Sequence, residues 1–472
     1  MNRNDYVKIF QAISQQDKSR NFNFTAGHLG SFSNPFRVEH EIKQLIVNNR
    51  MSAFTFLYSL IRILSLLILS ILPLKNLILF IRAILRKVLN KKLELSKEFL
   101  VVSIGAEKVE KDPYLSKILL LIKSDFDYFK IVGGTGVKNS GFIFFEQVFE
   151  LLDFLKIFSF IFINQYLAIF SLFVFSFNKK SMGDKIFYIN NCLEEIVSGS
   201  FYNNYLLELF GNKVSKYDRY TKLVFPMEGR NWEKKIILNF NKSKCETIGF
   251  IHCAITPRHL SLTSEMFYDS NEVPSIIISP STMAYNIVSK VFPTSNVIKG
   301  SFIRGINFPD NLNVEKNTIV FALTSNFIES KMIIKSILDS NLQKRYKIEI
   351  RLNTNTSTFK KIKKIVDTNN LTLYTSFSNN NTKPLVCLFR SSSTAIEYLR
   401  AGVNPVYLNL KSGFSNNIFD LDNTYNFSEL SIKSFDSFIP KEIGYNQKKC
   451  IEISNYYLQK SNFIDYMSCI ED

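Results

Sequence analysis

The chain has 472 residues, 46% of them hydrophobic and 21% charged, so it can bury the cores of two or three domains, and extensive disorder is excluded. Its formal net charge of +17 favours an anionic partner, either an acidic membrane or a phosphorylated small molecule; nucleic acid is not expected because no nucleic-acid-binding motif is present. The six cysteines are scattered without a CxxC pair, which argues against a disulfide framework and fits a reducing, cytoplasmic compartment.

Two apolar stretches stand out in the first third of the chain. Residues 51–74 contain one charge, Arg62, and residues 157–177 contain none, although Asn164 and Gln165 interrupt them. Each stretch is about as long as the 20 or so residues that cross a bilayer, but basic residues flank both sides of each and give no orientation. We expect helices that dip into the inner face of the plasma membrane and contact anionic lipid. True membrane spans and a buried core are the alternatives. The first residues of the chain contain no apolar run, so no secretory signal peptide is expected.

From about residue 184, short β-rich runs alternate with helical runs. One predicted strand, 97–105, precedes this alternation. The predicted strands within it are 185–190, 222–228, 247–255, 274–279, 317–323, 347–352, 371–376, 384–389 and 405–410. The predicted helices are 203–211, 231–240, 281–292, 325–338, 358–368 and 392–402. This alternation is typical of parallel, doubly wound sheets.

A polar connector at 306–317 divides the alternation into two units. We predict an α/β fold with two Rossmann-type domains facing a cleft, and membrane-associating helices in the N-terminal third. The predicted domains are 1–305, on the acceptor side, and 306–440, which binds the nucleotide donor. A helical segment at 441–472 is expected to pack back on the first domain.

The stretch RSSSTAIEYLRAGVNPVYLNL at 390–410 places small hydroxyl residues between a predicted strand and the start of a helix that Gly402 ends. A helix N-terminus presents unpaired N–H groups, to which small residues let a phosphate come close. A carboxylate one turn along can accept the hydroxyls of a ribose. Simple N-capping of the helix, with Glu397 in solvent, fits the same spacing. The candidate donor contacts here are Arg390, Ser391, Ser392, Ser393, Thr394 and Glu397.

This pattern, R-S-S-S-T-A-x-E-x-L-x-A-G-V-x-P-V, resembles the donor-site motif of GT-B glycosyltransferases, and more closely that of bacterial surface-carbohydrate biosynthesis proteins of capsule and O-antigen clusters. Three earlier passages resemble the same proteins in order: FPMEGRNWEKKI (225–236), GFIHCAITPRHL (249–260), and VPSIIISPSTMAYNIV with VIKGSFIRG (273–288 and 297–305). The resemblance covers roughly residues 184–410. It implies a GT-B-like fold and transfer of a sugar from a nucleotide-sugar donor to a surface polysaccharide (capsule, O-antigen or lipopolysaccharide).

One passage departs from the pattern. RLNTN (351–355) stands where many of these proteins carry Lys/Arg-x-His-Pro, with Asn353 in place of the histidine and no proline. The resemblance implies that this histidine helps to bind the donor, so either the donor differs here or Arg351 takes its role.

Three catalytic candidates precede the connector. His252 ends a predicted strand and has the chemistry of a general base for the acceptor hydroxyl, although a core histidine fits equally. Glu228 can serve as the base or can bind the acceptor. Glu233 is a further catalytic candidate, although a carboxylate in the first turn of a helix also stabilises the helix without any catalytic role. Trp232, the only tryptophan, can stack on an acceptor sugar. His259 is a weaker candidate for the base.

Further donor contacts are expected near the predicted hinge. Arg304 lies between two glycines in GSFIRG and suits a phosphate, or an ordinary ion pair. Thr324 and Ser325 lie between a predicted strand and the start of a second helix. They can contact a phosphate, or they can simply cap the helix.

No DxD pair ends a predicted strand, since DFD (125–127) lies in an unsuitable context, and we therefore predict no obligatory metal or other cofactor. Negative charge on the leaving nucleotide would be balanced by helix N-termini and arginines. Two alternatives stay open: a teichoic-acid-type transferase that moves a polyol phosphate from a CDP-linked donor, and a non-catalytic membrane-bound assembly component.

Overall fold

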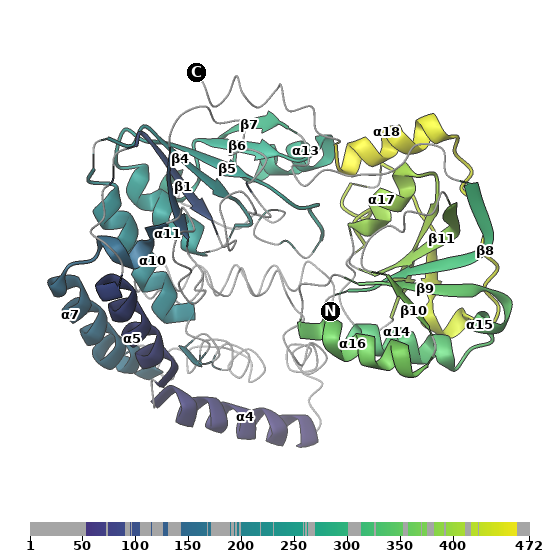
Figure 1. Ribbon diagram of the computed structural model, residues 1–472, viewed down its shortest axis with the longest axis horizontal. Coiled ribbons are helices and arrows are strands. Elements are labelled where there is room, and N and C mark those ends of the chain that lie inside the picture. The colour runs from purple at the N-terminus through teal and green to yellow at the C-terminus, as the bar shows by residue number, and fades with distance from the viewer. Residues whose placement is uncertain are drawn as a thin grey trace.

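The computed structural model divides the chain into two α/β halves, each built on one parallel sheet (Figure 1). It describes residues 53–71, 74–89, 95, 97–103, 115, 126–130, 143–167, 169–170, 189, 193, 196–197, 200–217, 219–229, 231–257, 259, 262, 270–300, 313–324, 327–352, 357–369, 371–374, 382–390, 393–410, 417–422 and 424–459.

The first sheet has seven strands within these residues, in the order β3-β2-β1-β4-β5-β6-β7, and every recorded pairing is parallel. Its strands are β1 (Phe99–Ser103), β2 (Phe126–Lys130), β3 (Ile143–Phe144), β4 (Lys222–Pro226), β5 (Glu246–Phe250), β6 (Ile276–Ser279) and β7 (Asn296–Lys299). The order reverses between β1 and β4, which makes that junction the topological switch point, where open α/β sheets bind ligands.

The second sheet repeats this plan in the order β10-β9-β8-β11-β12-β13, again with parallel pairing and with its switch point between β8 and β11. Its strands are β8 (Asn313–Ala322), β9 (Lys347–Arg351), β10 (Thr372–Tyr374), β11 (Thr382–Phe389), β12 (Asn404–Asn409) and β13 (Glu429–Ser431). The two sheets confirm the predicted fold class of two doubly wound α/β domains. The cleft expected between them stays a prediction.

Continuous apolar runs form the central strands because helices cover both faces of each sheet. FLVVS in β1 and IIIS in β6 are buried at every position. The helices that follow the alternation are α10 (Ser200–Val214), α11 (Asn231–Phe240), α13 (Thr282–Val291), α14 (Phe327–Leu338), α15 (Leu342–Arg345), α16 (Ser357–Thr368), α17 (Thr394–Arg400) and α18 (Gln447–Tyr457).

Helix α18 connects the two halves (Figure 1). It contacts both α17 and α13, and the N–H of Gln459, just beyond it, donates to the carbonyl oxygen of Pro280 at 3.0 Å. Ile453 and Tyr457 of α18 are fully buried and belong to a core cluster that includes residues of both sheets. The last described part of the chain therefore packs against the first half as well as the second.

Gly402 ends α17, as the sequence indicates. Its φ of 76° lies in the left-handed region, and the N–H of Val403 donates to the carbonyl oxygen of Tyr398, the six-to-one bond of a Schellman motif. A Cβ at this position would lie 2.6 Å from Oε1 of Gln447, the first residue of α18. Glycine here permits both the turn and the close approach of α18.

The two apolar stretches form helices that pack on one another. The first stretch, 51–74, forms α4 (Ala53–Ile71), and α5 (Leu74–Leu89) follows it. The second, 157–177, contains the end of α7 (Leu151–Ser159) and a π-helical turn, η3 (Phe160–Asn164). Ile63–Val88 is long and apolar enough to cross a bilayer by length and composition alone.

The polar interruption of the second stretch has a structural role. Gln165 is buried, donates to the carbonyl oxygen of Ser70 at 2.6 Å and accepts from the side chain of Asn76 at 2.7 Å. These bonds hold the α4–α5 corner against the helix that follows η3.

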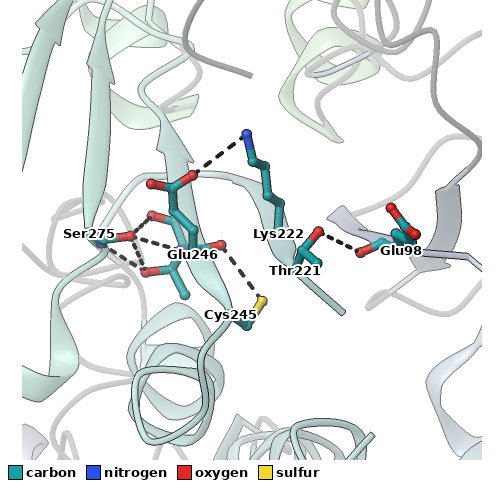
Figure 2. A network of polar contacts seen from close by, with 7 residues as sticks. Glu98, Thr221, Lys222, Cys245, Glu246 and Ser275 are labelled. Carbon is teal, nitrogen blue, oxygen red and sulfur yellow. Dashed lines mark hydrogen bonds and ion pairs between the residues drawn. The ribbon is translucent and has the colours of Figure 1, made fainter. Parts of the chain in front are cut away.

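Figure 2 shows polar contacts at the amino ends of β1, β4, β5 and β6, opposite the edge where ligands are expected. Lys222 and Glu246 lie 3.9 Å apart, and the Thr221 hydroxyl donates to the carbonyl oxygen of Glu98 at 3.4 Å. Because these charged groups belong to the same strands as the candidate site, they provide matched controls for substitutions there.

The structure corrects some predicted elements. Ile189, the one described residue of the predicted strand 185–190, is helical. The connector predicted at 306–317 overlaps β8, which begins at Asn313 because its polar start extends the ladder with β11. Strands β2, β7 and β13 were not predicted, since their sequences mix charged and apolar residues.

Candidate functional site

Glu228 and His252 meet at the carboxyl edge of the first sheet. Each lies two residues beyond the end of its strand, Glu228 after β4 and His252 after the adjacent strand β5. His252 Nε2 lies 2.9 Å from Glu228 Oε1. The parallel strands β4 and β5 thus place the Glu228 carboxylate and the His252 imidazole side by side, next to the switch point.

A tight loop holds Glu228 in position. Gly229 adopts a φ of 71°, and its N–H donates to Glu233 Oε2 at 2.7 Å. The N–H of Glu228 donates to both oxygens of the same carboxylate, at 3.0 and 3.1 Å. Glu233, at the third position of α11, therefore reaches back like the acid of a capping box and fixes the loop.

The exposure of these side chains separates their roles. Glu228 retains 17% of its side-chain exposure and His252 only 2%, while Glu233 is buried and engaged by backbone amides. Of the three predicted catalytic residues, Glu228 is therefore the one best placed to meet a ligand. His252 lies behind it as its hydrogen-bond partner, and Glu233 is a positioning residue.

Trp232 lies in the hydrophobic core. Its indole is 8% exposed and packs edge-on against Phe225, with ring centroids 6.2 Å apart. This position explains the residue as packing for α11 against β4 and gives no support to stacking on a sugar. Nδ1 of His259 accepts the N–H of Thr256 at 2.9 Å, a local loop contact.

Ser103, which was not predicted, ends β1 on the other side of the switch point. Its hydroxyl is fully buried and makes no hydrogen bond within the described part of the chain. A buried hydroxyl without a partner costs roughly 1–3 kcal/mol, and Ser103 lies at the edge where open α/β sheets bind ligands, so it is a further candidate contact. The signal was present in the sequence, because Ser103 is the polar end of an apolar run.

Arg351 and Glu397 form the corresponding pair of the second sheet. Arg351 is the last residue of β9, and its Nη2 lies 2.8 Å from Glu397 Oε2 on α17. Both side chains keep partial exposure, 16% and 21%. Burial raises the pKa of Glu397 above its ordinary value of 4.5, and the Arg351 guanidinium opposes this shift. The pair bridges the switch point, since Arg351 comes from β9 and Glu397 from the helix after β11.

Arg390 directly follows β11, as predicted, but its side chain is buried. It is 2% exposed, its Nη2 lies 3.2 Å from Glu329 Oε1, and its Nη1 donates to the Tyr407 hydroxyl and to the carbonyl oxygen of Leu408. The guanidinium also lies over the Tyr407 ring. The charge of Arg390 is thus balanced by Glu329 of α14, which favours a structural ion pair. A phosphate contact by Arg390 stays a prediction.

The remaining donor candidates are divided between described and undescribed residues. Helix α17 begins at Thr394, which is half-buried, and the preceding Ser393 is exposed and makes no capping hydrogen bond. Thr324 is buried, and its carbonyl oxygen accepts from the hydroxyl of Ser330 at 2.8 Å. The candidates that lie outside the described residues are Arg304, Ser325, Ser391 and Ser392; Asn353, the residue that departs from the pattern, lies outside them too.

Within the described ranges, no three His, Cys, Asp or Glu side chains lie close enough together to hold a metal ion. Asp127 of the DFD sequence belongs to β2, is buried, and accepts from the Tyr220 hydroxyl at 2.8 Å. That the protein needs no metal stays a prediction.

No protein-family model matches the chain, and no curated protein matches it. Among solved structures, the UDP-GlcNAc 2-epimerase of Neisseria meningitidis bound to UDP-GlcNAc is 13% identical, with a TM-score of 0.40 over 79% of this chain and 100% of that one. The UDP-GlcNAc 2-epimerase of Methanocaldococcus jannaschii is 10% identical, with a TM-score of 0.38 over 79% and 99%. The wall teichoic acid polymerase TagF is 11% identical, with a TM-score of 0.33 over 86% and 97%. Because these TM-scores lie below 0.5, the fold assignment rests on the strand order of this chain.

Proposed function

We propose that the protein is a GT-B-like glycosyltransferase that moves a sugar from a nucleotide-sugar donor to a surface-polysaccharide acceptor. The observation that carries this proposal is the pair of charged constellations at equivalent edges of two doubly wound sheets. Glu228 with His252 marks the first edge, and Arg351 with Glu397 marks the second. The sequence resemblance at 225–260 and 390–408 supplies the class of reaction.

The second edge supports donor binding. Ligands of such sheets bind beyond the carboxyl ends of the strands at the switch point, which Arg351 and Glu397 flank. A guanidinium matches phosphate oxygens with two parallel N–H bonds, and a carboxylate accepts ribose hydroxyls. In the proposed complex, Arg351 contacts the donor phosphate and Glu397 the ribose. Arg351 thereby takes the role that the departure at 351–355 left open.

The first edge supports proton transfer from the acceptor. Attack of an acceptor hydroxyl on the sugar requires removal of a proton as the new bond forms, which a carboxylate in hydrogen-bond reach can accept. Glu228 has the exposure for this role, and His252 orients its carboxylate through the 2.9 Å contact. Glu233 keeps the loop in the geometry that this requires.

Capsule, O-antigen and lipopolysaccharide chains are the acceptors that the resemblance favours. Such a chain grows on a lipid carrier, which agrees with the apolar helices of the first half. The donor would be a sugar linked to UDP, CMP or a related nucleotide.

A thermal-shift screen of the purified protein against UDP, CMP, CDP and their sugar conjugates tests the proposal. One nucleotide family should raise the melting temperature in wild type and fail to do so in Glu397→Ala. If only CDP-polyols stabilise the protein, a polyol-phosphate transferase replaces the sugar transferase. If none does, and cells carrying Glu397→Ala make normal glycan, the protein is a non-catalytic component.

A further inference from the structure

The helices of the first third expose a broad apolar face. Twenty of the twenty-four exposed large hydrophobic side chains in the described part of the chain lie on α4, α5, α7, η3 and the helical residues after η3. They are Leu57, Leu60, Ile61, Leu64, Ile68, Leu69, Ile71, Ile78, Ile81, Leu85, Val88, Leu151, Leu152, Leu155, Phe158, Phe162, Ile163, Tyr166, Leu167 and Phe170. We call this set the apolar face. Soluble monomers rarely expose so many large hydrophobic side chains on neighbouring helices, which marks these helices as an interaction surface.

The opposite side of these helices is part of the folded domain. Phe80 and Ala83 of α5 are buried in the core cluster, and Phe80 packs against Phe154 of α7 with ring centroids 6.3 Å apart. Arg86 of α5 pairs with the buried Glu146 at 2.6 Å. A helix fastened along one side to a water-soluble domain cannot be surrounded by lipid, so these contacts favour helices that lie in the plane of an interface.

A corresponding salt bridge fastens α7. Its Asp153 is buried and lies 2.5 Å from Nζ of Lys213 on α10. Asp153 is therefore neutralised inside the domain and adds no negative charge to the apolar face.

Among the described residues, most of the exposed charges around the apolar face are positive; the exception is Glu150 before α7, which lies 3.4 Å from Lys213. Helices α4 and α5 contain no acidic residue, and Arg82, Lys87 and Lys156 are exposed among the apolar side chains. An apolar face bordered by basic residues fits the boundary between headgroups and acyl chains of an anionic bilayer.

The second half contributes a lysine surface. Helix α16 buries Ile362 and Val366 and exposes its lysines to solvent, and the adjacent helix α14 does the same. The exposed lysines are Lys331, Lys335, Lys360, Lys361, Lys363 and Lys364. The acidic groups on or next to these helices are Glu329 on α14, which is buried against Arg390, Asp339 just after α14 and Asp367 on α16, so positive charge predominates at the surface. In Figure 1, α4 lies at the bottom of the view, and α14 and α16 lie on the lower side of the second half.

We propose that the apolar face and the α14–α16 lysine surface together bind an anionic lipid bilayer, with the helices lying in its plane. The apolar face enters one leaflet, and the lysines contact headgroup phosphates from the second half. Both halves would then rest on one membrane surface. Charge complementarity selects the bilayer over a second copy of the chain, since a self-contact would bring like charges together.

Vesicle flotation with the full-length protein tests this, using phosphatidylcholine vesicles with and without phosphatidylglycerol and no nucleotide. Leu64→Glu/Ile68→Glu should weaken partitioning into both vesicle types by about 100-fold or more, because each side chain loses its apolar burial. The matched control is Ile439→Glu/Tyr445→Glu, which alters exposed apolar residues outside the face and should bind as wild type does.

The lysine surface is tested separately. Replacing Lys360, Lys361, Lys363 and Lys364 by alanine should lower binding to phosphatidylglycerol vesicles by about 10- to 100-fold, given about fivefold for each lysine near the surface, and leave binding to neutral vesicles unchanged. A control that replaces four exposed lysines elsewhere by alanine should behave as wild type. Those four are Lys242, Lys290, Lys441 and Lys448.

Three results would overturn the proposal. The first is vesicle binding that neither set of substitutions changes. The second is a protein that ignores vesicles and forms a dimer in light scattering that Leu64→Glu/Ile68→Glu dissociates, which would make the face a self-interface. The third is a protease-protected fragment containing residues 53–89 after insertion, which would indicate a span. Because no donor is present, failure here leaves the proposed transferase activity unaffected.

Discussion

The carboxyl edges of the two sheets have the same strand plan and different charges. The first edge holds an acid–imidazole pair, Glu228 with His252, whose loop is fixed by backbone hydrogen bonds to Glu233. The second edge holds two arginine–carboxylate pairs. Arg390 with Glu329 of α14 is enclosed, and Arg351 with Glu397 is partly exposed. The same topology thus places a group suited to proton transfer in one half and groups suited to anion binding in the other.

The two arginine pairs of the second edge show how burial divides similar residues. Arg390 and Glu329 are enclosed, with Tyr407 completing the contacts of the guanidinium. Arg351 and Glu397 keep 16% and 21% of their side-chain exposure. Spacing along the chain could not separate the two arginines, whereas the structure shows that Arg390 is enclosed and Arg351 is partly exposed.

The largest effect is expected at the first edge. Glu228→Gln removes the proposed base while keeping its size, so sugar transfer should fall by about 10²- to 10⁴-fold with little change in nucleotide binding. Initial rates with labelled donor measure this. Glu246→Gln, at the amino end of β5, is the matched control and should retain activity; equal activity of the two variants would remove Glu228 from the mechanism.

The next largest effect is expected at the enclosed pair of the second edge, Arg390 with Glu329. Arg390→Leu leaves the Glu329 carboxylate buried without its cation, and the free energy of unfolding should fall by about 3–5 kcal/mol. Urea denaturation measures this. The double variant Arg390→Leu/Glu329→Leu should recover much of the loss. A stable Arg390→Leu protein with weakened nucleotide binding would instead restore Arg390 as a donor contact.

The partly exposed pair should affect binding more than stability. Glu397→Ala is expected to weaken nucleotide binding by about 10- to 100-fold, the loss of a hydrogen-bonded carboxylate worth roughly 1.5–3 kcal/mol. Isothermal titration calorimetry measures this. An unchanged dissociation constant would separate Glu397 from the ribose.

The Glu397 carboxylate should also make the stability of the protein and its nucleotide affinity depend on pH. Because burial raises the pKa of Glu397 above 4.5, the folded protein keeps this proton at a pH at which the unfolded chain has lost it. Stability should therefore fall as the pH rises from 4.5 through the raised pKa, while nucleotide affinity should rise over the same interval as the carboxylate ionises. Glu397→Gln should flatten both curves; curves that match wild type would assign the titration to another group.

The smallest effect is expected at the junction of α17 and α18. Gly402→Ala forces a left-handed residue to carry a Cβ 2.6 Å from Gln447, which should cost about 1–2 kcal/mol of unfolding free energy. Chemical denaturation measures the change, and Gly444→Ala, where a Cβ would meet no atom within 4 Å, is the control. An equal effect of the two substitutions would contradict this account of the turn.

Most of the second sheet could be predicted from the sequence, because strands buried on both faces read as continuous apolar runs. The predicted strand 384–389 lies within β11, and the predicted helix 358–368 lies within α16. Strand β2, with the sequence FDYFK, could not be predicted locally. Its Asp127 tolerates burial only because Tyr220, 93 residues later, donates to it.

The site was predictable in position and less so in role. Strand ends located Glu228, His252 and Arg351, since residues just beyond parallel strands gather at one edge. Which of them faces outward depends on tertiary contacts that spacing does not encode: Glu233 is engaged by two backbone amides, and Arg390 is engaged by Glu329.

The proposed function depends on binding of an activated nucleotide by Arg351 and Glu397. Calorimetric titration of nucleotides into wild type, Glu397→Ala and the control Glu246→Ala tests this binding most directly. The account predicts saturable one-to-one binding of one nucleotide family to wild type and to Glu246→Ala, with affinity lost by tenfold or more in Glu397→Ala. Binding that is equal in all three proteins, or heat of binding from none of the nucleotides, would contradict it.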